Sequence, residues 1–377
     1  MFWLRNVGLA FLVLAMVVAL SLYSRYGGGD PYLDLSTAPL FGEEALETVL
    51  AFPEPFGNVA ASADGRVFFT VHPESGPTGP VLYEVRDGAA VPYPTREISE
   101  ARFVTALGLT IDQQNRLWVI DHGNHGFAGA SLTAFDLASG EIVHEVTFGS
   151  DIGEWASFLN DLSVSPDGRY VYIADVSFFG KNPALVVYDM ETGEAWRVLE
   201  EHPSVIAQDW IIENPEKTMT FFGGLIALKP GVDGIVVDAG GEYVYYGAMT
   251  HDGLYRVPTS VLNDRSASDD AVAAAVERVG EKPLSDGLSI DVEGNVYITD
   301  VEHGGVARMA PDGSLQTLIA SDQVRWADGI SYGGDGYYYF TDSAIPDQML
   351  QSKSHIKAAA PYYLYRFKAD IEGIPGR

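Results

Sequence analysis

The sequence predicts an all-β fold, a six-bladed β-propeller, on the basis of three observations. A hairpin pattern recurs six times along the chain, turn residues are abundant, and an N-terminal segment matches a strand that the last repeat lacks. The 377 residues include 40 Gly and 20 Pro, which favour many turns over long helices. Closed all-β folds often exceed the usual domain size, so we expect the six repeats to form one domain.

Each repeat reads as a hairpin that begins with a small or acidic residue and turns at Gly or Asn. In the third copy, residues 160–164 are followed by a turn at 167–168 and by a strand rich in Val, Ile and Tyr at 171–175. A third and a fourth strand follow in most copies, which is typical of propeller blades. The last copy lacks its fourth strand, and residues 46–50 closely match the fourth strand at 315–319. We therefore expect the N-terminal segment to complete the last blade and to cover its edge.

An apolar segment near the N-terminus determines the expected location. Arg5 precedes the apolar run 7–20, and Arg25 follows it. This length lies between that of a membrane span and that of the apolar core of a signal peptide. We expect residues 1–25 to be a signal peptide or membrane anchor and residues 26–39 to be a linker. The propeller, residues 40–377, would then lie outside the cytoplasm, whether secreted, periplasmic or membrane-anchored.

Charge and cysteine content restrict the partners. The chain has 52 acidic and 23 basic residues, a net charge of −29 that repels phosphate backbones. We therefore expect a small-molecule ligand and no nucleic acid, together with the membrane if the N-terminal segment is retained. The chain contains no Cys, which excludes disulfides, thiolate metal sites and cysteine nucleophiles.

Polar residues open several of the repeats, and the propeller geometry brings them together. The residues in matching positions are Gly57, Leu107, Asn160, Asp233, Asp286 and Asp328. The first strand of each blade lies nearest the axis, so carboxylates at these positions repel one another unless a cation or proton joins them. Oxygen ligands of this type suit Ca²⁺ or another hard divalent cation, with Asn160, Asp233 and Asp286 as candidate ligands. Alternatively, such side chains cap turns by bonding backbone N–H groups.

Two further groups of residues are candidates for the same end of the channel. His303 follows Asp286 in one repeat, and the two are candidates for general acid–base catalysis near neutral pH. Aromatic residues in the loops would line a pocket for a flat ligand, or would pack between blades instead. The candidate ligand-binding residues are Trp155, Phe158, Phe222, Trp326 and Asp328.

Four short motifs occur in an order that is typical of a known family. They are Leu117-Trp118-Val119-Ile120-Asp121, Phe158-Leu159-Asn160-Asp161, Tyr172-Ile173-Ala174-Asp175 and Ser285-Asp286-Gly287. Over about residues 105–345 the chain resembles the major royal jelly protein/yellow family, which includes dopachrome-converting proteins and bacterial relatives. The resemblance implies a secreted six-bladed propeller that binds a small organic molecule and, in some members, is linked to dopachrome tautomerisation.

The chain is also similar, more distantly, to metal-dependent lactonases of the senescence-marker-protein/gluconolactonase type. That resemblance implies a divalent metal held by Asn and Asp, with Asn160, Asp233 and Asp286 at comparable places. The family's first-blade Glu is missing, because Gly57 and Asn58 stand there. Three functions therefore stay open: a binding propeller that isomerises its ligand, a metal-dependent lactone hydrolase, and a non-catalytic binding or scaffold module.

Overall fold

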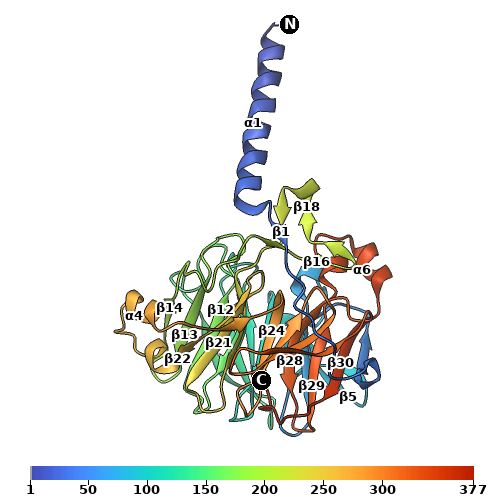
Figure 1. Cartoon of the computed structure of the whole chain (residues 1–377), viewed down its shortest axis with the longest axis vertical. Helices are drawn as coiled ribbons and strands as arrows, with labels where there is room; N and C mark the ends of the chain where they lie inside the picture. The colour runs from blue at the N-terminus through green and yellow to red at the C-terminus, as the bar shows by residue number, and fades with distance from the viewer. Residues whose placement is uncertain (1) are drawn as a thin grey trace.

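Six four-stranded antiparallel sheets form the body of the protein in the computed structural model, which describes residues 2–377. The sheets are arranged around a common axis, so the predicted six-bladed β-propeller is confirmed (Figure 1). The first blade consists of β3 (Phe56–Ala61), β4 (Val67–Val71), β5 (Leu82–Arg86) and β6 (Ala89–Pro92). The second consists of β7 (Ala106–Ile111), β8 (Arg116–Asp121), β9 (Ser131–Asp136) and β10 (Ile142–Thr147). The third consists of β11 (Leu159–Val164), β12 (Tyr170–Asp175), β13 (Ala184–Asp189) and β14 (Glu194–Val198).

The other three blades repeat this plan. They are β20 (Val232–Val237), β21 (Tyr243–Ala248), β22 (Gly253–Pro258) and β23 (Glu277–Glu281); β24 (Ser285–Ile290), β25 (Val296–Asp300), β26 (Gly305–Met309) and β27 (Leu315–Ala320); and β28 (Ala327–Tyr332), β29 (Tyr337–Asp342), β30 (Tyr362–Lys368) and β2 (Glu47–Phe52). The inner strands β3, β7, β11, β20, β24 and β28 neighbour one another in this order and close the ring.

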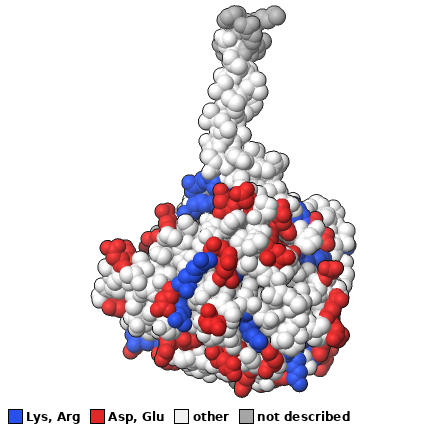
Figure 2. Space-filling model, in the orientation of Figure 1, with Lys and Arg blue, Asp and Glu red and all other residues white. Residues whose placement is uncertain are grey.

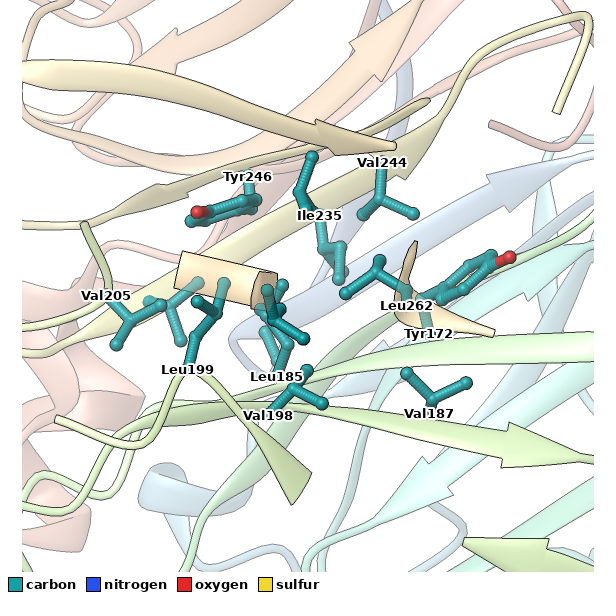
Figure 3. Packing of buried hydrophobic residues seen from close by; sticks show 14 of the residues in the cluster. Tyr172, Leu185, Val187, Val198, Leu199, Val205, Ile235, Val244, Tyr246 and Leu262 are labelled. Carbon is teal, nitrogen blue, oxygen red and sulfur yellow. The ribbon is translucent and has the colours of Figure 1, made fainter. Parts of the chain in front are cut away.

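Adjacent blades pack face to face through branched and aromatic side chains. Figure 3 shows the layer between the third and fourth blades, where Leu185 and Val187 of β13 meet Ile235, Val244 and Tyr246 of the next blade. All of these side chains are buried. Because burial of a Val, Leu or Ile side chain contributes about 1.5–3 kcal/mol, these layers hold the ring together.

The N-terminal strand closes the ring, as the sequence predicts. β2 pairs antiparallel with β30, from Glu47 opposite Arg366 to Phe52 opposite Tyr362. Glu47 and Arg366 also form an ion pair of 2.8 Å across the two strands. The edge of the last blade is therefore covered by a strand from the other end of the chain.

Helix α1 (Phe2–Tyr26) projects away from the propeller and contacts it through its last turn (Figure 1). Its stretch Asn6–Tyr26 is long and apolar enough to cross a membrane or to act as a signal sequence, and no part of it is buried. After the helix, β1 (Asp30–Pro31) pairs in parallel with β15 (Trp210–Ile211), which belongs to the large insertion before the fourth blade. Two hairpins of this insertion complete this end of the molecule: β16 (Glu213–Asn214) with β17 (Lys217–Thr218), and β18 (Thr220–Phe221) with β19 (Ile226–Ala227).

The remaining elements are short. They are η1 (Glu43–Ala45), η2 (Pro73–Ser75), α2 (Arg96–Ala101), β16 (Glu213–Asn214), β17 (Lys217–Thr218), β18 (Thr220–Phe221), η3 (Phe222–Gly224), β19 (Ile226–Ala227), α3 (Thr259–Leu262), α4 (Asp269–Ala274), α5 (Ile345–Gln348) and α6 (Lys353–Ala359).

The end of the channel away from α1 is filled by Arg377. Its guanidinium donates to the carbonyl oxygens of Val237 (2.7 Å) and Val164 (3.0 Å), which belong to two different blades. Its backbone oxygen accepts from the Tyr332 N–H at 2.7 Å and from the Ser289 hydroxyl at 2.6 Å. This residue therefore ties four blades together and blocks the channel at this end.

Deletion of residues 43–52 should lower the melting temperature, because it exposes the edge of β30 and removes the buried side chains of Leu50 and Phe52. We expect a loss of at least about 3 kcal/mol from these two side chains. Thermal unfolding followed by circular dichroism measures the effect, with the exposed residue change Glu44→Ala as the control. A deletion variant as stable as the control would contradict the closure.

Candidate functional site

A cavity of about 220 Å³ lies at the end of the channel nearest α1. Its polar floor consists of Asn160, Asp233, Asp286 and Asp328, which come from four blades. Its walls are mostly apolar and come from the loops around the channel: Phe158, Val176, Phe178, Phe179, Phe221, Ile226, Leu228, Met249, Trp326, Ile345 and Met349. The exposed side chains of Phe222 and Leu350 mark its mouth.

A β-bulge at the start of each inner strand aims these polar groups at the axis. In the fourth blade, Val232 lies opposite Ala248, but the next pair is Ile235 with Tyr246, so the two residues between them bulge. The same slip occurs at the same place in the other five blades. Bulges re-aim side chains, and here they hold Asp233 and its counterparts toward the channel.

In four of the six blades the second bulge residue is glycine, and it lets neighbouring inner strands approach closely. A Cβ atom at Gly234 would lie 2.6 Å from the backbone oxygen of Asp286, and one at Gly287 would lie 2.6 Å from that of Asp328. Any larger residue would push the strands apart and would separate the acidic side chains. The Asp-Gly pairs that open the last three repeats are thus explained by strand packing and by the site together.

The acidic floor is buried, and its charges repel one another. Burial raises the pKa of Asp233 and Asp328 well above the ordinary value, and the neighbouring carboxyl of Asp286 raises both further. Burial also raises the pKa of Asp286 itself to about 6, although a hydrogen bond from Trp326 Nε1 (2.8 Å) and the charge of Lys282 oppose the shift. A positive charge entering this floor would therefore be strongly stabilised.

Two asparagines complete the polar ring. Asn160 donates from Nδ2 to Asp233 Oδ1, whereas its buried Oδ1 has no hydrogen-bond partner among residues 2–377. Asn58 and Asp161 lie one residue further along their inner strands, and Asn58 donates to Asp161 Oδ1. Burial raises the pKa of Asp161 to about 8, and the carboxyl of Asp286 adds to the shift, so Asp161 belongs to the same acidic cluster. The unpaired oxygen of Asn160 is thus a free acceptor within the polar ring.

Lys282 has a buried amine near the acidic residues. Its amine donates to Ser285 Oγ at 2.8 Å and to the Pro283 carbonyl at 3.1 Å. Burial lowers its pKa to about 7, and the charges of nearby carboxyls limit the shift; in decreasing order of effect these are Asp252, Asp300, Asp233 and Asp286. Because its amine bonds to these neutral groups and to no carboxylate, it neutralises the negative charge of the floor only in part.

A histidine–glutamate cluster on one side of the cavity was missed by the sequence analysis. His72, Glu74 and His125 line the wall, and His125 Nε2 lies 3.0 Å from Glu74 Oε1. Burial lowers the pKa of His72 to about 4, so its ring is neutral at pH 7. One signal was present in the sequence, because His72 and His122 directly follow the second strands of the first two blades.

Most of the predicted site residues meet in this cavity. Phe158, Phe222, Trp326 and Asp328, the predicted ligand-binding residues, line it together with the predicted metal ligands Asn160, Asp233 and Asp286.

The structure places two other predicted residues, Trp155 and His303, outside the cavity lining. Trp155 is 70% exposed and packs edge-on against Phe127. His303 Nδ1 is 2.9 Å from Asp300 Oδ2, and its Nε2 is 3.4 Å from Asp34 of the linker. The hydrogen bond with Asp300 raises the pKa of His303 to about 9. The ring is therefore charged at neutral pH and is a poor general base there, in contrast to the expected proton shuttle.

Comparison with known families agrees with this architecture. The family model of the major royal jelly protein matches residues 104–324. The chain belongs to this family. Among its relatives, major royal jelly protein 3 of Apis mellifera is 24% identical over 247 residues, which cover 62% of this chain and 42% of the relative. Major royal jelly protein 2 of Apis mellifera is 26% identical over 45% of this chain and 38% of its own length. The match thus spans about two fifths of these relatives.

Solved structures with the same fold include enzymes. A gluconolactonase from Xanthomonas campestris superposes with a TM-score of 0.53 at 14% identity, over 86% of this chain and 89% of its own. Regucalcin, a calcium-binding protein from Agrobacterium tumefaciens, gives a TM-score of 0.53 at 15% identity over 91% and 98% of the two chains. A luciferin-regenerating enzyme gives 0.55 at 10% identity, over 88% and 97%. At these identities the likeness shows the fold alone.

His303 should titrate with a pKa of about 9, and Asp300→Asn should return that pKa toward 6.5. A raised native pKa means that the pair stabilises the fold below about pH 6.5 and that this contribution is lost as the pH rises through 9. NMR titration of ring-labelled histidine measures both values, and His202 provides an internal reference in the same spectrum. A wild-type His303 pKa at or below 6.5 would contradict the ion pair.

Proposed function

We propose that this protein binds a small organic molecule with an apolar or aromatic body and a positively charged head, and that it does so outside the cytoplasm. One observation supports the proposal: a single cavity combines apolar walls with a floor of buried carboxyl groups. Buried carboxyls are costly unless a cation or proton joins them, and a ligand cation would remove that cost.

The walls fit the remainder of such a ligand. Phe158, Phe178 and Phe221 line the cavity with aromatic rings that a flat body can contact. The indole N–H of Trp326 donates a hydrogen bond to Asp286. Aromatic rings next to an acidic floor also favour a cationic head through cation–π attraction. The volume of about 220 Å³ restricts the ligand to a small molecule.

Isomerisation of the bound ligand is the finer part of this proposal. A tautomerisation moves one proton from one ligand atom to another, and it needs a group that exchanges protons near neutral pH. Asp286, with a pKa of about 6, meets this requirement, and His125 with Glu74 lines the same cavity. The family resemblance to dopachrome-converting proteins supports the same reaction class. Binding without turnover would favour a non-catalytic binding module instead.

Tyramine, an aromatic amine, should bind more tightly than 4-ethylphenol, which has the same ring but no amine. Asp233→Asn should weaken tyramine binding about tenfold or more, which corresponds to about 1.4 kcal/mol, and should leave 4-ethylphenol unchanged. Tyramine binding should also tighten from pH 6 to pH 8, because the cation requires deprotonated carboxyls and Asp286 loses its proton near pH 6. Isothermal titration calorimetry measures these constants, with Glu293→Gln, in an exposed turn, as the control. Equal affinities for the two ligands would refute the cationic head.

A metal-dependent lactone hydrolase is the second candidate, and one observation favours it. The unpaired Asn160 Oδ1 lies in a ring with the carboxyl oxygens of Asp233 and Asp286, and oxygen ligands suit Ca²⁺. The number of ligands does not fit, because no three His, Asp or Glu side chains within residues 2–377 are placed to hold a metal. The first blade contributes Gly57 where a further carboxylate would be needed.

Calcium therefore provides a separate test. If this candidate holds, millimolar Ca²⁺ should raise the melting temperature of the wild-type protein, excess chelator should reverse the rise, and Asn160→Ala should abolish it. Differential scanning calorimetry measures the shift, with Glu293→Ala, in an exposed turn, as the control. A melting temperature that does not respond to Ca²⁺ would eliminate the hydrolase and would leave the binding proposal intact.

A further inference from the structure

We propose that the face of the propeller around the cavity mouth rests on the lipid bilayer, so that the cavity opens at the lipid–water interface. The occupant of this face is the bilayer that α1 crosses, rather than a protein partner. The proposal concerns the orientation of the propeller and does not require a particular ligand.

The length of α1 places the propeller directly at the membrane surface. The apolar stretch Asn6–Tyr26 contains 21 residues, and at about 1.5 Å per residue it spans about 32 Å. The hydrocarbon core of a bilayer is about 30 Å thick, so the whole stretch is needed to cross it. The last turn of the helix, with Tyr23, Arg25 and Tyr26, therefore lies at the interface, where Tyr and Arg are favoured.

This last turn is already in contact with the rim of the cavity. The Tyr26 hydroxyl donates to the Phe179 backbone oxygen at 2.9 Å, and Arg25 Nη2 donates to the Gly180 backbone oxygen at 2.8 Å. Phe179 is itself a lining residue of the cavity. Lys229 then bonds to the backbone oxygen of Gly27, at 2.9 Å, just beyond the helix. No spacer separates the end of the membrane span from the cavity mouth.

Large apolar side chains are exposed at the rim of the cavity, although their contact with water is unfavourable. Phe222 is 68% exposed, Leu350 is 65% exposed and Phe179 is 45% exposed, and all three line the mouth. Phe127 and Trp155 extend the same face, with their ring centroids 5.8 Å apart. Single exposed apolar residues are ordinary, whereas a group of them around one cavity marks a contact surface.

Basic side chains border the base of the helix, although the chain as a whole is acidic. Figure 2 shows basic and acidic groups next to one another at the base of the white, apolar helix, with acidic and basic groups scattered over the propeller below. Arg25 belongs to the last helical turn, and Lys181 lies with its amine 4.5 Å from the centre of the Phe178 ring. These positions suit lipid phosphate groups, which attract Lys and Arg close to the surface.

This orientation has a consequence for the ligand, and this consequence alone rests on the proposed function. A molecule with an apolar body and a cationic head collects at the lipid–water interface, and the mouth of the cavity opens at that depth. The head can then enter toward Asp233 and Asp286 while the body stays in contact with apolar side chains throughout. We infer that the natural ligand is an amphiphilic amine that partitions into membranes.

Because the chain has no native Cys, single cysteines can report on the orientation. The full-length chain is reconstituted into phosphatidylcholine vesicles as Phe222→Cys or Leu350→Cys, each labelled with the environment-sensitive dye NBD. The matched control is Val292→Cys, which is 52% exposed in the turn after β24, at the opposite end of the channel. Vesicles that contain lipids brominated near the headgroup should quench the dye at 222 and 350 at least about threefold more than at 292.

Two results would overturn the proposal. Equal quenching at 222, 350 and 292 would show that the rim lies in water. A dye at 222 or 350 that is shielded from water but not quenched by brominated lipid would show a protein partner or a second copy on this face.

The retained helix is tested separately. Mass spectrometry of the protein from membranes of the producing cells should find residues 2–26 present, and a shortened, soluble chain would overturn the proposal. Neither experiment uses tyramine, so a failure of ligand binding is distinguishable from a failure of membrane contact.

Discussion

The close approach of neighbouring inner strands is the constraint on which the site depends. At the bulges of the fourth and fifth blades, Gly234 and Gly287 let the next strand come near enough that no Cβ atom would fit. This closeness sets the radius of the channel, and the radius sets how near Asp233, Asp286 and Asp328 come to one another. In a slightly wider ring the three carboxylates would be solvated, and they would repel one another less.

The acidic floor is costly for folding, and the costs are visible in the raised pKa values. Burial and mutual repulsion both disfavour the charged state of Asp233 and Asp328, and the nearby amine of Lys282 bonds to neutral groups. Large hydrophobic layers between the blades offset this cost, as the packing of the third and fourth blades illustrates. The free energy gained by packing between the blades thus offsets the unfavourable electrostatics at the centre of the ring. Such unfavourable electrostatics are typical of binding sites.

The two ends of the channel have become different. Arg377 bonds to backbone groups of several blades and fills one end, whereas the cavity lies at the other. At that other end, the insertion before the fourth blade and the loop after β12 surround the mouth with apolar side chains, and α1 ends against them. One fold that is nearly symmetric in its six blades therefore has a single functional face.

The sequence by itself determined the six blades, the closure by residues 46–50 and the convergence of Asn160, Asp233, Asp286 and Asp328, because these features repeat with the period of the fold. The loops do not repeat, and only the tertiary structure decided which of their residues meet. It joined Phe178, His72 and His125 at the cavity, turned Trp155 outward, and fixed His303 as a charged partner of Asp300. Loop paths and pKa values depend on contacts between segments far apart in the chain, and no local pattern encodes those contacts.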